Sequence, residues 1–395
     1  MESTTLLAIN LSTLIIIVFS AHLLCLRSFE RQAYLPLAFF LLAIGIVICQ
    51  PTLASLADHL RPTILILSLP SILLIAPFFW FYVEGITAKT PWQLNQMDKK
   101  HFILFTLGAV VAFIGLFIPY EVQYTLLIND DESIFNNISE ETKALTIGTL
   151  IATVLLVLAW VVQAGFYLFK VIKRLTKYRQ HLKNLFASTE TKEIRWIGWL
   201  LLAVGIVWLI TALNIVVDSI LFSNEVNASI SGLIILIMVW SVAIWGLRQK
   251  PGFEELYDAD DNIQQMLAEK PSQPEKYQRS ALNEQSAAKI AEKIEIAMQQ
   301  DKLYLDASLS LQKLAKHIST SPNYISQTLS EALGANFFDY INKYRINEAK
   351  QQLKHSQDTV LVIAMNVGFN AKSSFYTAFK KETQQTPSQY RKSSE

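Results

Sequence analysis

Long apolar runs fill the first half of the chain and stop abruptly near residue 250. Each run has about 20 residues, which is enough for a helix to cross the hydrocarbon layer of a bilayer. The runs cover residues 6–26, 35–53, 64–86, 102–119, 144–169, 197–217 and 230–247. This pattern predicts a bundle of seven transmembrane helices in residues 1–249.

Basic residues are sorted into alternate loops between these runs. Arg27 and Arg31 follow the first run, and eight Lys and Arg side chains lie in residues 170–195. The long loop over residues 120–143 is instead acidic. Because basic residues in short loops tend to stay in the cytoplasm, we expect an outer N-terminus and a cytoplasmic C-terminus.

The periodicity changes after the last apolar run. Residues 250–277 hold three prolines and seven acidic side chains with little periodicity, and we assign residues 250–280 to an acidic linker. Residues 284–303 then show apolar positions at helical spacing. Two partners are open for the apolar stripe of this helix: the helices that follow it, or a second copy of itself.

Two similar pairs of short helices are predicted in residues 281–395. Ser310 can cap the first helix of the first pair, and Ser321-Pro322 can start its second helix, over residues 322–332. In the second pair, Asp358 and Asn370 can cap the two helices.

A continuous helical pattern joins the two pairs. The pairs cover about residues 308–334 and 358–382, and the connecting helix covers residues 337–354. Each pair has the layout of a helix-turn-helix unit. A rigid connector could place two reading helices about one duplex turn apart, or ~34 Å.

The second helix of each pair has a polar face that the apolar positions leave uncovered. The residues on the two faces are Asn323, Ser326, Gln327 and Ser330 in the first pair, and Lys372, Ser373, Tyr376, Thr377 and Lys380 in the second. Such side chains can donate to and accept from base edges in a major groove. For one helix alone a solvated face would be the simpler interpretation. Arg391, near the end of the chain, can reach a phosphate or pair with a carboxylate.

Composition and charge fit a chain that is half membrane and half soluble. Hydrophobic residues make up 52% of it and charged residues only 17%, below the roughly one quarter of soluble proteins. From Lys276 onward, sixteen Lys and Arg face eleven Asp and Glu, which suits a polyanionic partner. No phosphate loop, nucleophile motif or metal-ligand spacing occurs, so we expect no enzyme, cofactor or metal site.

The C-terminal residues resemble the AraC/XylS family of transcriptional regulators. The similarity covers roughly residues 305–392, and its most specific part is IAMNVGFNAKSSFYTAFKKETQQTPSQYR, residues 363–391. It implies a tandem helix-turn-helix fold and base contacts from Asn323, Ser326 and Gln327, and from Lys372, Ser373, Tyr376 and Thr377. Two positions depart from the family pattern: Gln384 stands where Gly is usual, and Ala371 where a small polar residue is usual.

These patterns together predict an all-α, membrane-bound one-component regulator in the inner membrane of a bacterium. Its expected partners are double-stranded promoter DNA and the lipid bilayer. RNA polymerase, a second copy of the chain and a small-molecule or envelope signal stay open as further partners. Two alternatives also stay open: a membrane region that only anchors the protein, and a transporter or enzyme with a regulatory DNA-binding tail.

Overall fold

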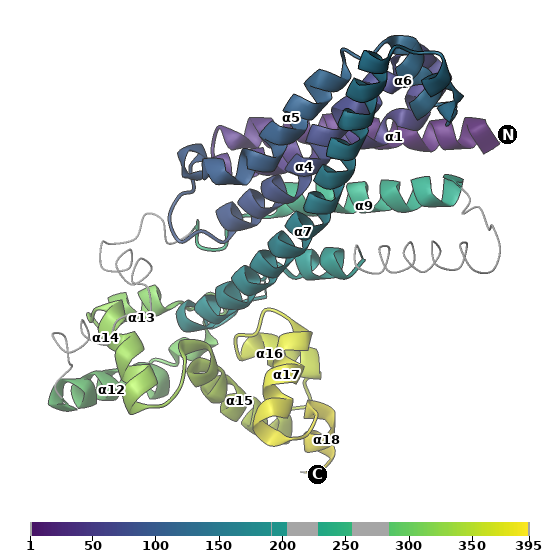
Figure 1. Cartoon of the computed structure of the whole chain (residues 1–395). Coiled ribbons are helices and arrows are strands. Elements are labelled where there is room, and N and C mark those ends of the chain that lie inside the picture. Colours follow the sequence, from purple (N-terminus) through teal and green to yellow (C-terminus); the bar gives the residue numbers. More distant parts are fainter. Residues whose placement is uncertain (1, 191, 204–227, 255–283, 394–395) are drawn as a thin grey trace. The chain divides into compact units, whose positions relative to one another are not determined.

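The computed structural model describes residues 2–190, 192–203, 228–254 and 284–393 (Figure 1). Within these ranges every regular element is a helix, and one isolated antiparallel bridge pairs Phe186 with Ser310. The all-α class predicted from the sequence is therefore confirmed for the described residues.

The chain forms two compact units. The N-terminal unit comprises Met1–Arg174 and Ile194–Pro251, and the C-terminal unit comprises Leu175–Glu193 and Gly252–Glu395. The sequence placed residues 1–249 together, whereas the structure groups Leu175–Glu193 with the C-terminal helices because these residues hydrogen-bond to them. Most of the predicted linker, residues 255–280, lies outside the described residues.

The N-terminal unit is built from long apolar helices. They are α1 (Glu2–Ser28), α2 (Leu35–Ile48), α3 (Gln50–Leu56), α4 (Arg61–Ile86), α5 (Ile103–Gly115), α6 (Tyr120–Leu127), the first part of α7 (Glu140–Leu185) and α9 (Ala228–Arg248). Short 3-10 turns lie between them at Gln32–Tyr34, Asp58–Leu60, Leu94–Gln96, Lys99–Phe102 and Glu132–Asn136. Helix α1 packs against α2 and α9, and α4 packs against α2 and α5.

Four helices of the described chain are long and apolar enough to cross a membrane: Thr4–Ser28, Asp58–Ile86, Glu140–Leu185 and Ser229–Arg248. The bent pair α5–α6 raises the number to five if it counts as one span. The predicted count of seven is thus not confirmed. The expected helix over residues 35–53 ends at Ile48, because the first turn of α3 contains a proline that has no N–H to continue α2. Part of the expected helix over residues 197–217 lies outside the described residues.

Helix α5 stops earlier than its hydrophobic pattern predicts. It ends at Gly115, and the chain bends by 115° before α6 begins at Tyr120. The side-chain amide of Gln123 donates from Nε2 to the carbonyls of Ile118 at 2.7 Å and Gly115 at 3.2 Å. Gln123 thereby adds a donor for two backbone carbonyls at the end of α5, one of which, Gly115 O, also accepts from Ile118 N.

Helix α7 has 46 residues and is therefore about 69 Å long at 1.5 Å per residue. The sequence predicted a membrane helix ending at residue 169, but the basic stretch that follows continues the same helix to Leu185. From Leu175 onward its residues belong to the C-terminal unit.

The C-terminal unit consists of short helices around the longer α15. The elements are α12 (Glu284–Gln299), a 3-10 turn (Leu303–Leu305), α13 (Leu311–His317), α14 (Pro322–Gln327), a π turn (Thr328–Ala332), α15 (Phe337–His355), α16 (Val360–Asn366), α17 (Lys372–Thr383) and α18 (Pro387–Lys392). Figure 1 shows α15 between the pair α13–α14 and the pair α16–α17. Helix α12 buries Ile294, Ala297 and Met298 and packs on the first pair, so within the described chain its apolar stripe is covered there.

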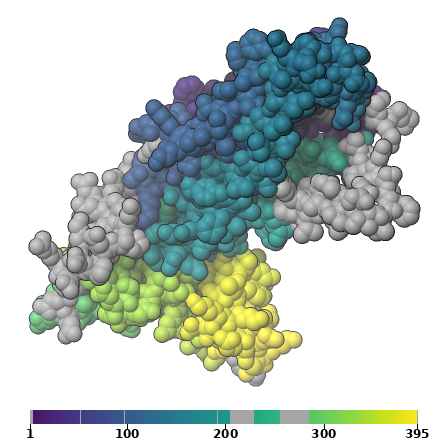
Figure 2. Space-filling model, in the orientation of Figure 1, coloured from purple at the N-terminus to yellow at the C-terminus, as the bar shows by residue number. Residues whose placement is uncertain are grey.

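The last helices form a body with its own hydrophobic core (yellow in Figure 2). Phe375 and Phe379 of α17 are fully buried and pack against Ile363 and Ala364 of α16 and Ala349 of α15. The packing leaves the opposite side of α17 in solvent.

Candidate nucleic-acid interface

The first helix pair is built largely as the sequence predicts. The side chain of Ser310 accepts a hydrogen bond from Lys313 N at 3.3 Å and caps α13. Pro322 lies in the first turn of α14, and Ile325 and Leu329 are buried. One detail differs: the helix expected over residues 322–332 changes to a π turn after Gln327.

The polar face of α14 is accessible to solvent, but two of its side chains already make hydrogen bonds within the chain. Gln327 donates from Nε2 to Glu331 Oε2 at 3.0 Å, and Ser330 Oγ donates to Gln327 O at 3.3 Å. Ser326 and Ser330 line a hollow of about 330 Å³ that Asn184 also lines. Asn184 lies near the end of α7, and no sequence pattern linked it to this helix.

Tyr324 is a candidate contact that the sequence reasoning missed. Its side chain is exposed on α14, one residue after Asn323 and three before Gln327. A tyrosine can stack through its ring and donate or accept through its hydroxyl, so it can contact a base or a phosphate. The three-residue spacing to Gln327 was the signal that could have identified it.

Both helices of the second pair begin with a cap that differs from the predicted one. Thr359, not Asp358, accepts a hydrogen bond from the backbone, at 3.3 Å from Val362 N. Helix α17 begins after Ala371, which has no side-chain acceptor. Asn370 instead donates from Nδ2 to Ala307 O at 3.2 Å, so its amide joins two loops of the unit.

The outer face of α17 carries the predicted second reading surface. Lys372, Ser373, Thr377 and Lys380 are exposed and Tyr376 is half-buried. The Lys372 ammonium lies 5.4 Å from the centroid of the Tyr376 ring, which favours a cation–π contact. This face is therefore more basic than that of α14. Its assignment to DNA, like that of α14, stays a prediction.

Arg391 has a structural contact in addition to its predicted role. Its Nη2 donates to Asp358 O at 2.7 Å, just before α16 begins. The same guanidinium has a buried Nε atom without a hydrogen-bond partner in the described chain. Arg391 thus holds the start of α16, and its contact with a phosphate stays a prediction.

Arg345 of α15 is fully buried and joins the segment before the first helix pair to the residues that follow α7. Its Nε donates to Tyr304 O at 2.7 Å and its Nη2 donates to Asp306 O at 2.9 Å. Its Nη1 donates to Ala187 O at 3.1 Å and to Ser188 Oγ at 3.0 Å. Burial lowers the pKa of Arg345 to about 10, so the guanidinium remains charged at neutral pH.

Two left-handed backbone positions shape the second pair. Gly368 has φ +92°, and an added Cβ would lie 2.7 Å from Tyr304 O. Gln384 ends α17 with φ +60°, a conformation that glycine adopts without steric cost. The departure from the family pattern at Gln384 therefore keeps the backbone conformation and adds strain.

A family model described as a helix-turn-helix domain matches residues 314–393. These residues contain both reading helices described above. Residues 314–393 form a helix-turn-helix domain of the AraC type. The matched residues include none of the candidate membrane helices.

Curated relatives are regulatory proteins that match less than a third of this chain. An uncharacterised helix-turn-helix-type transcriptional regulator of Staphylococcus aureus is 34% identical over 113 residues, which are 29% of this chain and 14% of that protein. The regulatory protein PocR of Salmonella typhimurium is 36% identical over 92 residues, which are 22% of this chain and 30% of PocR. The chain therefore spans well under half the length of these curated relatives.

Two solved structures also match about a quarter of the chain. A protein of unknown function from Listeria innocua is 30% identical, with 27% of this chain and 98% of that chain covered and a TM-score of 0.25. The C-terminal domain of the response regulator yesN from Fusobacterium nucleatum is 33% identical, with 26% and 98% covered and a TM-score of 0.24.

Proposed function

We propose that this chain is a membrane-bound one-component transcriptional regulator. Its AraC-type domain binds promoter DNA sequence-specifically on the cytoplasmic side of the inner membrane of a bacterium. Its N-terminal unit senses a signal in or across that membrane. Neither part acts as an enzyme in this proposal.

One observation carries the DNA-binding half of the proposal. Two helix-turn-helix pairs share α15, and the second helix of each pair has an outer polar face. Helix α15 has 19 residues and is therefore about 28 Å long. A connector of that length supports the placement of two reading helices in successive major grooves, about 34 Å apart.

The candidate spans and the distribution of charge support the membrane half. Four helices of the described residues are long and apolar enough to cross a bilayer, and basic residues cluster in residues 170–195. Positive residues near the ends of spans tend to stay in the cytoplasm, the compartment that holds DNA. A regulator held at the membrane binds only promoters that reach its surface.

A genome-wide footprint tests both halves. We expect the full-length chain to protect a small set of promoters, and Gln327→Ala to lose that set at equal protein abundance. Promoter output of the full-length chain, followed across growth conditions at equal protein abundance, shows what the membrane half adds. If output is the same under all conditions, the N-terminal unit is an anchor. If the full-length protein protects no promoter, the DNA-binding proposal is wrong.

A further inference from the structure

We infer that the N-terminal unit contains a binding site for an uncharged, mostly apolar small molecule that carries a hydroxyl group. The site is a cavity of about 270 Å³ lined by residues of α4, α5, α6 and α7. The inference deepens the sensing part of the proposed function, on which it rests, by naming the class of signal.

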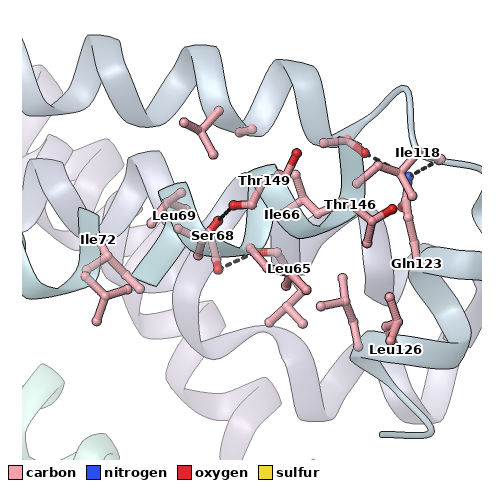
Figure 3. A pocket seen from close by; sticks show the side chains of 17 residues that line it. Leu65, Ile66, Ser68, Leu69, Ile72, Ile118, Gln123, Leu126, Thr146 and Thr149 are labelled. Atoms are coloured by element: carbon pink, nitrogen blue, oxygen red, sulfur yellow. Dashed lines mark hydrogen bonds between the residues drawn. The ribbon is translucent and has the colours of Figure 1, made fainter. Parts of the chain in front are cut away.

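The cavity is larger than a packing defect and has one apolar and one polar end. An engineered cavity of roughly 150 Å³ in a protein core is enough to bind benzene, so this one fits a larger molecule. Figure 3 shows Ile72 and Leu69 toward one end and Gln123 and Thr146 at the other, with Ser68 and Thr149 between them. Every residue that lines it is uncharged. The lining therefore selects against ions.

The hydroxyl groups along the cavity are free to accept but not to donate. Thr146, Thr149 and Thr153 of α7 each donate to the carbonyl four residues earlier, at 2.8 to 2.9 Å. Ser68 of α4 donates to Leu65 O at 2.6 Å. Each oxygen keeps a lone pair, because a hydroxyl has one donor and two acceptor positions. A bound molecule that donates a hydrogen bond complements this arrangement.

The polar end of the cavity lies where the fourth apolar segment breaks. Gln123 uses its Nε2 to satisfy the carbonyls of Gly115 and Ile118, which leaves its Oε1 as a further acceptor. Irregular backbone within a membrane is tolerated where it is buried in protein or lines a cavity, and broken helices often form substrate sites in transporters. The bend of 115° therefore lies at the end of the cavity where Gln123 offers its acceptor.

The expected topology gives this site access from the outer side. Loop charges place residues 120–143 outside, and the cavity lies next to the start of that segment. A hydrophobic alcohol that partitions into the outer leaflet reaches the site without crossing the membrane. A lipid acyl chain is the competing occupant, and it offers no hydrogen-bond donor to the Ser and Thr hydroxyls that line the cavity.

Photolabelling of the full-length chain tests the site directly. The protein is placed in nanodiscs of phosphatidylethanolamine and phosphatidylglycerol and labelled with a diazirine derivative of 1-decanol. We expect saturable labelling of peptides that line the cavity, and competition by unlabelled 1-decanol but not by decane or decanoate. Labelling that does not saturate, or that decane displaces equally, would show lipid-like filling and overturn the inference.

Matched variants separate the acceptors from the fold. Thr146→Val and Thr149→Val keep the shape but remove an acceptor each, so we expect affinity for 1-decanol to fall roughly three- to tenfold. Thr106→Val is the control, because Thr106 makes the same bond to Phe102 O at 2.7 Å on the exposed face of α5. Ala112→Leu fills the cavity and should abolish saturable labelling, whereas Val110→Leu on the exposed face should not. Equal effects of cavity and control variants would contradict the site.

Promoter output distinguishes this inference from the proposed function. If 1-decanol labels the cavity but leaves output unchanged, the site stands and this molecule is not the signal that the regulator reads. If output responds to 1-decanol equally in the parent and in Ala112→Leu, sensing stands and this site is wrong.

Discussion

The guanidinium of Arg345 donates a hydrogen bond from Nη1 to the hydroxyl of Ser188 at 3.0 Å. Arg345 lies in the middle of the DNA-binding unit, whereas Ser188 lies three residues beyond the end of α7. Ala187 adds a second acceptor, and its N–H donates to Leu309 O at 3.1 Å. The residues after α7 are therefore part of the packing of the C-terminal unit.

Removal of this guanidinium should destabilise the C-terminal unit strongly. Arg345→Met leaves the buried carbonyls of Tyr304 and Ala187 without the Arg345 donor, at roughly 1 to 3 kcal/mol each, so we expect a loss of at least about 2 kcal/mol. Ser188→Ala removes one bond to a charged group and should cost about 1.5 kcal/mol. Pulse proteolysis of the full-length protein in detergent measures both losses.

Lys343→Met is the control for these variants, because Lys343 is exposed on the same helix. Its effect should stay within about 0.5 kcal/mol. A loss for Ser188→Ala no larger than that of the control would mean that Ala187 and Ser188 do not stabilise the unit in solution.

The stability of this unit should fall at high pH because of Tyr304. Burial, with a smaller contribution from the nearby Glu348 carboxylate, raises the pKa of Tyr304 to about 12 from an ordinary value of about 10. Since the folded pKa is above the unfolded one, the stabilisation is complete below about pH 10 and is lost as the pH rises towards 12. The difference in unfolding free energy between the parent and Tyr304→Phe should shrink over that interval. A difference that is constant with pH would contradict this assignment.

Buried faces and helix caps were predictable from the sequence where the residues of one helix determine them. The apolar spacing predicted the buried faces of α14 and α17, and Ser310 was correctly identified as a cap. Asp358 and Thr359 are both good caps, and only the final geometry selects Thr359. The boundary of a helix is therefore ambiguous wherever two neighbouring residues can perform the same function.

Contacts between distant segments were not predictable in the same way. Nothing in the residues around Ser188 indicates that it meets Arg345, which is 157 positions later in the chain. The count of seven spans is not confirmed, and at residues 102–119 the reason is related, because hydropathy records length and composition but not bends. The break after Gly115 is stabilised by Gln123, whose partners appear only once the chain has turned.

Gly368 should be far less replaceable than Gly334. Both have positive φ, but an added Cβ at Gly368 would meet Tyr304 O at 2.7 Å, whereas nothing lies within 4 Å at Gly334. Gly334→Ala should therefore cost about 1 kcal/mol for the backbone conformation alone. Gly368→Ala should cost at least about 2 kcal/mol, since it adds a steric clash to that strain. Thermal unfolding of the two variants measures the difference, and equal losses would exclude the clash.

Gln384→Gly should stabilise the protein. Gln384 is held at φ +60°, and glycine relieves the steric cost of that conformation, which is about 1 kcal/mol. The bond from Gln384 Nε2 to Lys381 O, at 3.2 Å, is exposed and offsets little of this gain. Gln385→Gly is the matched control and should be neutral or destabilising, because the backbone at Gln385 needs no positive φ. A loss of stability for Gln384→Gly would mean that the side chain matters more than the strain.

The two reading faces should respond differently to salt. Gln327→Ala and Lys372→Ala should each weaken specific DNA binding by roughly 1 to 3 kcal/mol if the side chains touch base edges. Only Lys372→Ala should also lower the slope of log affinity against log salt, by about 1, if the ammonium neutralises a phosphate.

Binding titrations of the full-length protein at several salt concentrations measure both quantities, with Lys343→Ala as control. If both variants bind like the parent, α14 and α17 do not read DNA through these residues. An equal change of slope in both would contradict the division into an amide face that discriminates and a basic face that adds affinity.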